Sequence, residues 1–190
     1  MKLPISRRDV VLAGAATAAV PAFARAQRHR FGILGGRAPK LAVPWWIDAE
    51  GEPTQVSADV GQGKWLFLKC FQSWCPACHS HGFPTLKKVS DTFADDARFV
   101  ALGIQTVFEG FSTNTRERVR EIQLRYDLSI PMGHDAGDPG GDHRPQTMRD
   151  YRTGGTPWII IVDPKGQVVF NDYHLNTEMF ITRMREILSA

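Results

Sequence analysis

The chain of 190 residues lacks a long apolar run, and its excess charge is small. A membrane-spanning helix needs roughly 20 predominantly apolar residues, whereas the uncharged run over residues 10–24 is short, rich in alanine and interrupted by Pro21. The net charge is only +3, and residues 1–40 hold eight basic residues and one acidic residue, so the remainder carries −4. The sequence therefore predicts no stable membrane anchor, and composition gives a folded domain no support for nucleic-acid binding.

The N-terminal residues have the organisation of an export signal. A basic stretch over residues 1–8 precedes the uncharged run, and small residues follow it up to Ala26. This pattern predicts a cleavable signal peptide over residues 1–26 and a location in the bacterial periplasm. The pair Arg7-Arg8 favours twin-arginine export over general secretion. Residues 27–37 are then expected to form a basic extended arm, followed by one domain over residues 38–190.

Alternating patterns predict an α/β domain with a mixed sheet. Residues 64–71 are apolar on both faces, which is typical of a central strand covered on both sides. Asn114, with Glu117 three residues later, predicts a capped helix start, and Asn176 predicts another. Residues 135–146 are poor in apolar side chains and are expected to form a loop. The expected strands are 45–47, 54–57, 64–71, 99–104, 158–162 and 167–170, and the expected helices are 75–93, 114–126 and a last one after Asn176.

Cysteine is scarce, and its three copies lie within nine residues: Cys70, Cys75 and Cys78. Cys75 and Cys78 stand three apart at the expected start of a helix, where their side chains share one face within disulfide reach. Free N–H groups and the helix dipole favour an anion at that place, so Cys75 is expected to attack as a thiolate. Cys78 is expected to be the resolving thiol. Pro76 suits the first helical position, where its missing N–H costs nothing.

The segment Trp74-Cys75-Pro76-Ala77-Cys78 after an apolar strand, together with Gly154-Gly155-Thr156-Pro157-Trp158 before another, resembles the thioredoxin superfamily. Within it the chain looks most like the exported TlpA-like thiol:disulfide oxidoreductases. The resemblance implies a thioredoxin-like sandwich, a mixed central β-sheet flanked by helices. It also implies a cis Pro157 facing the cysteines and a Thr156 backbone that pairs with a substrate chain. A Thr-Pro bond entering an apolar strand agrees with a cis bond.

The same resemblance implies a function for the cysteine pair. The expected activity is disulfide exchange in the reducing direction, through a redox-active Cys75–Cys78 disulfide and with no other cofactor. The expected partners are protein thiols or disulfides and a redox partner protein, and the chain is expected to be a monomer. Trp74 and Trp158 flank the pair and are expected either to form its apolar rim or to fill the core.

Three features depart from the family pattern. Pro84 lies six positions after Cys78, where the family has five, which predicts a bulge in the helix near Gly82. Lys69 stands where many thioredoxins have a buried acid, and it either lowers a thiol pKa or extends outward into solvent. The acidic residue that the family often has between the second cysteine and the proline is absent, with His81 nearby instead, and His79 and His81 are candidates for tuning the pKa of the pair.

Other readings of the cysteines remain open. Cys75 and Cys78 followed by His79 match the pattern for c-type haem attachment. The two cysteines with His79 and His81 are also candidate ligands for copper or zinc, as in a metal chaperone. A thiol peroxidase of the peroxiredoxin type is a third alternative, although Gln72 stands where those enzymes have threonine.

Two further groups of residues are expected to play structural roles. Cys70 is expected to be a small buried hydrophobe. A polar cluster is expected to form a solvated loop in preference to a metal site, and it consists of His134, Asp135, Asp138, Asp142 and His143.

Overall fold

A mixed sheet forms the centre of the fold in the computed structural model, which describes residues 31–190. Within that range the sheet has seven strands in the order β2-β1-β5-β4-β3-β6-β7. The strands are β1 Trp45–Ile47, β2 Pro53–Thr54, β3 Trp65–Phe71, β4 Phe99–Val107, β5 Met132–Ala136, β6 Trp158–Val162 and β7 Val168–Asp172. The helices are a π-helical segment η1 Cys78–Gly82, α1 Phe83–Thr92, α2 Arg116–Arg125, α3 Gln146–Asp150 and α4 Thr177–Ser189. The predicted signal peptide and the first four residues of the predicted arm lie outside the described residues.

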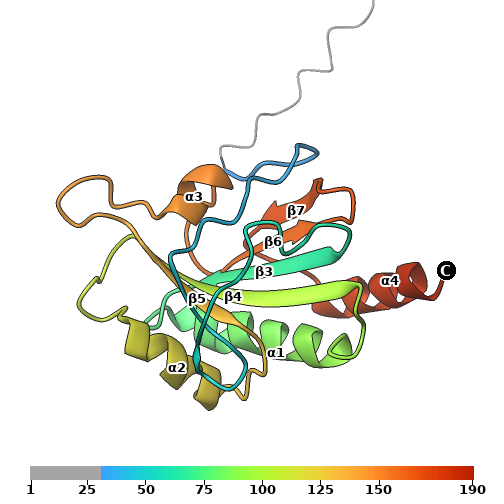
Figure 1. The fold of residues 1–190 in the computed structure, drawn as a ribbon, viewed down its shortest axis with the longest axis horizontal. Helices are drawn as coiled ribbons and strands as arrows, with labels where there is room; N and C mark the ends of the chain where they lie inside the picture. Colours follow the sequence, from blue (N-terminus) through green and yellow to red (C-terminus); the bar gives the residue numbers. More distant parts are fainter. Residues whose placement is uncertain (1–30) are drawn as a thin grey trace, which may run out of the picture.

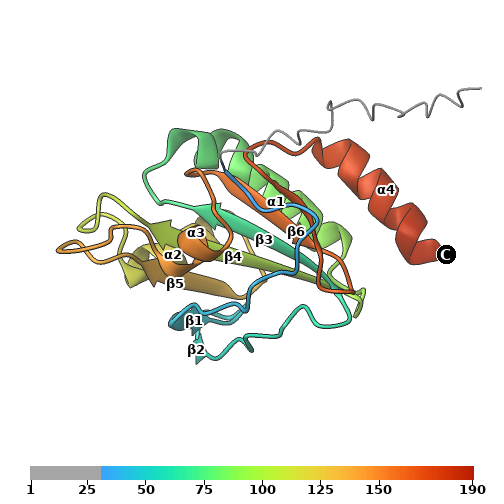
Figure 2. The same ribbon diagram turned by 90° about the horizontal axis from the view of Figure 1, so that it is seen from above.

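Strand β3 is the central strand of this sheet, as its sequence predicts. It pairs parallel with β4 and antiparallel with β6. Its residues after Trp65 are all buried, because helices α1, α2 and α4 cover one face while α3 and the N-terminal segment cover the other (Figures 1 and 2). Burial on both faces explains the continuous apolar run of this strand. Strands β3, β4 and β5 run parallel, so their carboxyl ends meet at one edge of the sheet.

Alternate residues of β3 belong to two separate cores. Phe67 and Phe71 pack with the helices α1, α2 and α4 in one cluster. Leu66, Leu68 and Cys70 pack on the opposite face with Trp158. The sheet therefore separates the side chain of Cys70 from the face that carries Cys75 and Cys78.

The described part of the predicted arm is extended, and it is paired with the domain. The backbone N–H of Gly35 donates to the carbonyl oxygen of Val168 at 2.8 Å, and the N–H of Val168 donates to the carbonyl oxygen of Gly36 at 2.9 Å. Arg37 forms a further bridge to Gln167. Residues 31–37 therefore lie along β7, the edge strand of the sheet.

Three structural details differ from the sequence predictions. Strand β5 and helix α3 occupy parts of the segment predicted to be a loop. Helix α2 begins after Thr115, and Asn114 does not cap it. Asn176 does cap α4, as predicted, and accepts from the N–H of Met179 at 3.0 Å, but the side chain of Met179, an apolar residue of the first turn, is exposed.

Candidate active site

The cysteine pair lies where the chain leaves β3 and enters a helix. Helical geometry begins at Pro76, so Cys75 occupies the cap position and proline the first helical position, as predicted. The helix then widens into the π-helical segment Cys78–Gly82 before α1 begins. This segment confirms the predicted bulge near Gly82 and accounts for the extra residue before Pro84.

Hydrogen bonds around Cys75 favour its thiolate. Cys75 is a free thiol, 5% exposed, and its Sγ lies 3.2 Å from the backbone N of Cys78 and 3.5 Å from the carbonyl oxygen of Thr156. The hydrogen bond from the Cys78 thiol is the main cause that lowers the pKa of Cys75 to about 6. Hydrogen bonds from the Thr156 side chain and from the N–H groups of Cys78 and Ala77 act in the same direction, whereas burial opposes them. Cys75 is therefore the thiol suited to nucleophilic attack.

Cys78 and Cys70 have the opposite character. The hydrogen bond to Cys75, followed by burial, raises the pKa of Cys78, so the shared proton stays on Cys78. Burial raises the pKa of Cys70 to about 12. Both residues are fully buried. Cys70 therefore behaves as a buried apolar side chain, whereas Cys78 can act only on a sulfur already attached to its neighbour Cys75.

Cys75 should accordingly react with iodoacetamide at a rate that rises between about pH 5 and pH 7 and then levels off, because its pKa lies near 6. The measurement is the rate of carbamidomethylation by mass spectrometry, with the modified residue identified by peptide mapping. The same protein unfolded in urea provides the control and should titrate near the unperturbed value of 9.0. A native midpoint near 9 would contradict the assignment of Cys75 as the thiolate.

The loop before β6, which contains Thr156 and Pro157, faces Cys75. The Thr156-Pro157 bond is cis, as the resemblance predicts. The Thr156 carbonyl faces Cys75, and Trp158 continues into the sheet, where its Nε1 donates to Asn171 at 2.6 Å. Trp158 is buried and fills the core, whereas Trp74 is 46% exposed. Of the two tryptophans, Trp74 alone can form the rim of the site.

Asn114 holds the loop that leads to Cys75, a role that the sequence did not reveal. Its Oδ1 accepts from the backbone N–H of Ser73 at 2.7 Å and from the Ser73 hydroxyl at 2.9 Å. Its Nδ2 donates to Gln72 Oε1 at 3.0 Å and to the carbonyl oxygens of Glu109 and Gly110. Gln72 Oε1 also accepts from Trp74 Nε1 at 2.8 Å. The buried amide of Asn114 therefore joins the active-site loop to the loop that follows β4.

His79 and His81 have different surroundings. Nε2 of His79 lies 2.7 Å from the carbonyl oxygen of Ser73, and Nδ1 lies 2.6 Å from the hydroxyl of Tyr126. Because a carbonyl can only accept, Nε2 donates to Ser73, and Nδ1 forms a hydrogen bond with the Tyr126 hydroxyl. Both ring nitrogens of His79 are thus engaged within the protein, while exposed His81 contacts Ser80 at 2.7 Å. Neither haem nor metal ligation by His79 fits this arrangement without breaking a hydrogen bond.

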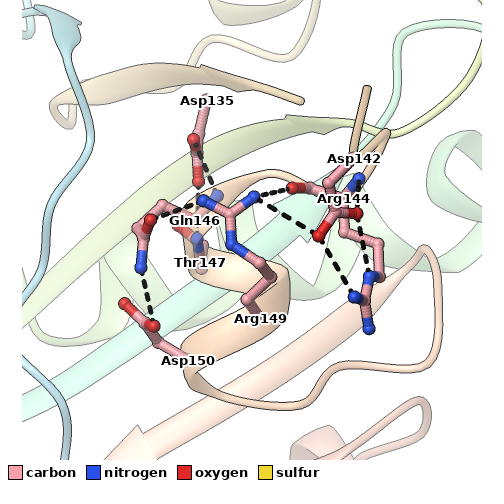
Figure 3. Close-up of polar contacts among 7 residues, drawn as sticks. All are labelled: Asp135, Asp142, Arg144, Gln146, Thr147, Arg149 and Asp150. Carbon is pink, nitrogen blue, oxygen red and sulfur yellow. Dashed lines mark hydrogen bonds and ion pairs between the residues drawn. The ribbon is translucent and has the colours of Figure 1, made fainter. Parts of the chain in front are cut away.

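Two members of the polar cluster, Asp135 and Asp142, contact helix α3 and the residues just before it (Figure 3). Asp135 is buried, contrary to the expected solvated loop, and its carboxylate accepts from the backbone N–H groups of Gln146 at 3.3 Å and Thr147 at 2.7 Å. Asp142 pairs with Arg144 at 3.0 Å. These carboxylates already have partners. In the chain from residue 31 onward, no three His, Cys, Asp or Glu side chains are grouped to hold a metal ion.

Lys69 is the remaining candidate residue, and it does not extend outward. Its side chain is 2% exposed and ranks among the largest fully buried side chains. Burial lowers the pKa of Lys69 to about 8, whereas the nearby thiols, with Cys78 first, act to raise it. The structure therefore places a buried amine on the same side of the sheet as the cysteine pair.

The family assignment follows from sequence similarity over most of the chain. Residues 34–171 match the AhpC/TSA family. The chain belongs to the AhpC/TSA family. No curated protein has a similar sequence.

Solved structures supply further relatives. A thioredoxin-like superfamily protein is 28% identical, with a TM-score of 0.69, and the match covers 80% of this chain and 95% of the other. A thiol-disulfide isomerase from Corynebacterium glutamicum is 27% identical, with a TM-score of 0.68 and coverage of 80% and 97%. A thiol:disulfide interchange protein DsbE from Chlorobium tepidum, 17% identical with a TM-score of 0.55 and coverage of 83% and 98%, shows the shared fold. These matches confirm the predicted thioredoxin-like fold and the prediction of an oxidoreductase.

Proposed function

We propose that this protein exchanges disulfides with exported protein partners through the Cys75–Cys78 pair, in the reducing direction. The observation that supports the proposal is the difference in pKa between the two thiols of the pair. Cys75 has its pKa lowered to about 6 while that of Cys78 is raised, so one thiol attacks and the other resolves. The disulfide of this pair is the only cofactor that the proposed reaction requires.

The reaction proceeds through a mixed disulfide. The thiolate of Cys75 attacks one sulfur of a substrate disulfide, and the other substrate sulfur leaves as a thiolate and takes up a proton. Cys78 then loses its proton and attacks the Cys75 sulfur, which releases the second substrate sulfur and leaves the Cys75–Cys78 disulfide. A redox partner protein with a dithiol returns two electrons to the pair; one of its two protons goes to the sulfur of Cys78, while Cys75 remains a thiolate. When Cys75 is a thiolate and no longer donates to it, the carbonyl of Thr156 can accept from the backbone of a bound substrate segment.

Export and location in the bacterial periplasm are part of the same proposal. They rest on the basic and apolar pattern of residues 1–26, which suits cleavage after export. None of the helices in the described part of the chain is long and apolar enough to cross a membrane. We propose that the mature protein works as a monomer on folded or unfolded exported partners.

The reduction potential of the pair tests the direction. Equilibration with dithiothreitol redox buffers, followed by mass spectrometry of the alkylated protein, should give one two-electron transition near the value of a reducing thioredoxin, about −270 mV. A Cys70→Ser variant should show the same transition, because Cys70 lies on the other face of the sheet. A value near about −120 mV, typical of a strong oxidant, would contradict the reducing direction.

The family match carries a second candidate, a thiol peroxidase. In that reaction Cys75 would reduce a peroxide and Cys78 would resolve the sulfenic acid. Gln72 is buried with its Oε1 engaged by Trp74 and Asn114, so its carbonyl is not available to a peroxide. Rapid consumption of hydrogen peroxide by a Cys78→Ser variant, faster than its attack on a disulfide, would favour the peroxidase.

A further inference from the structure

A lysine occupies the middle of the central strand. Lys69 lies opposite Gly103 of β4 and Ile159 of β6 in the sheet register, and it is 2% exposed. Placing an ammonium there is costly unless nearby groups stabilise its charge. The neighbours of Lys69 therefore decide what the amine does.

The end of the Lys69 side chain lies directly beneath the cysteine helix. A Cβ atom placed on Gly82 would stand 3.0 Å from Cε and 3.5 Å from Nζ of Lys69, and 3.3 Å from Cβ of Pro157. Glycine at this position thus leaves room for the lysine between η1 and Pro157. Since η1 begins at Cys78 and Pro157 follows the Thr156 carbonyl that faces Cys75, the amine lies between the two segments that hold the pair.

Only thiols act electrostatically on this amine to an appreciable degree. Among the described residues, Lys69 forms no ion pair with a carboxylate and no side-chain hydrogen bond. Burial lowers the pKa of Lys69 to about 8, and negative charge on Cys78, Cys70 or Cys75 acts to raise it. Of these three thiols only Cys75 has its pKa lowered, so Cys75 is the one that carries charge near pH 7. The facing residues of the other neighbouring elements are uncharged, namely Gly103, Ile159, Gly82 and Pro157. The charge on Lys69 is thus coupled to the redox state of the pair.

We propose that Lys69 gains a proton when the Cys75–Cys78 disulfide is reduced, and that the resulting ammonium stabilises the dithiol form. The inference rests on the proposed disulfide exchange and specifies its proton balance. In the disulfide form there is no thiolate nearby, so the buried amine is more easily neutral. In the reduced form the negative charge of the Cys75 thiolate acts on the amine and favours the ammonium.

The atoms and electrons balance with a dithiol as reductant. Dithiothreitol gives two electrons and its two thiol protons and becomes a cyclic disulfide, and the S–S bond between Cys75 and Cys78 breaks. One proton goes to the sulfur of Cys78 and the other to Nζ of Lys69, while Cys75 remains a thiolate. No proton is released to solvent. Without Lys69, the second proton is released, and the equilibrium constant for reduction then rises tenfold for each unit of pH.

The test compares the wild type with Lys69→Met, which keeps the length of the side chain and removes the amine. Equilibrium with dithiothreitol is measured between pH 6.5 and pH 9. At pH 7 the equilibrium constant for reduction of Lys69→Met should be lower by about tenfold, equivalent to a potential about 30 mV more negative. Above pH 8, where the pKa of Lys69 leaves the amine neutral in both forms, the two proteins should converge. Lys64→Met, at the exposed residue immediately before the same strand, is the matched control and should follow the wild type.

The wild type alone provides a second readout, which holds even if Lys69→Met does not fold. The logarithm of its equilibrium constant for reduction by dithiothreitol should rise with pH above about pH 8 and become constant below that pH. If Lys69 has only a structural role, the same plot should have a slope of one over the whole range. A slope of one in the wild type, or equal constants for wild type and a folded Lys69→Met at pH 7, would overturn the inference. Absence of any dithiol–disulfide transition in the wild type would instead overturn the proposed function, and the inference with it.

Discussion

A Cys75→Ser variant should lose disulfide exchange to the level of the reductant alone, a decrease of about 10³-fold or more. Cys75 is the thiol whose pKa is lowered to about 6, while Cys78 is fully buried with its pKa raised and Cys70 faces the opposite core. Neither remaining cysteine can therefore replace the nucleophile. The measurement is the rate of insulin reduction in the presence of dithiothreitol.

Two other cysteine variants separate attack from resolution. Cys78→Ser should still attack a substrate disulfide, but it should accumulate as a mixed disulfide, visible as a mass increase that dithiothreitol removes. Cys70→Ser should retain exchange close to the wild-type rate, since the sheet lies between Cys70 and the pair. Exchange retained by Cys75→Ser would show that the reactive thiol is elsewhere and would refute the proposed mechanism.

The central strand and the cysteine pair could be predicted because their signals are local. A strand that is apolar on both faces is stable only where other elements cover both faces, and β3 is covered in this way. The spacing of Cys75 and Cys78, with Pro76 between them, fixes a helix start within a few residues. The misplaced Pro84 likewise predicted a local bulge, and the π-helical segment is found there.

Features that depend on distant partners could not be predicted. Strand β5 includes Gly133, His134 and Asp135, residue types that are not typical of strands, and it forms because β4 and β1 pair with its two sides. Asp135 is polar and yet buried, since it caps a helix eleven residues later in the chain. The sequence pattern of β3 did not show which face of the sheet carries the Lys69 side chain. The contact of Lys69 with Gly82 shows that the side chain lies on the face of the cysteine helix.

The role of Asn114 also depends on residues that are distant in the sequence. A capping pattern predicted a local role for it at the start of a helix, whereas its amide binds the backbone of a loop 41 residues earlier. The two roles predict different results for replacement by alanine. Loss of a helix cap costs about 1 kcal/mol and would leave exchange unchanged.

An Asn114→Ala variant should therefore be destabilised by about 2 to 4 kcal/mol, measured by urea denaturation. The substitution removes the acceptor of the Ser73 N–H and one of the two donors to Gln72 Oε1, which keeps only its bond from Trp74. The exchange rate should also fall by roughly 10- to 100-fold, because the loop leading to Cys75 loses the contact that orients it.

Asn176→Ala is the matched control for this prediction, since Asn176 does cap a helix and lies outside the site. It should lose only about 1 kcal/mol and exchange disulfides at the wild-type rate. Equal effects of the two variants on stability, with exchange intact in both, would mean that Asn114 does not position the loop. If Asn114→Ala instead loses exchange while remaining folded, the orientation of Cys75 depends on a contact made across the edge of the sheet, between loops that follow adjacent parallel strands.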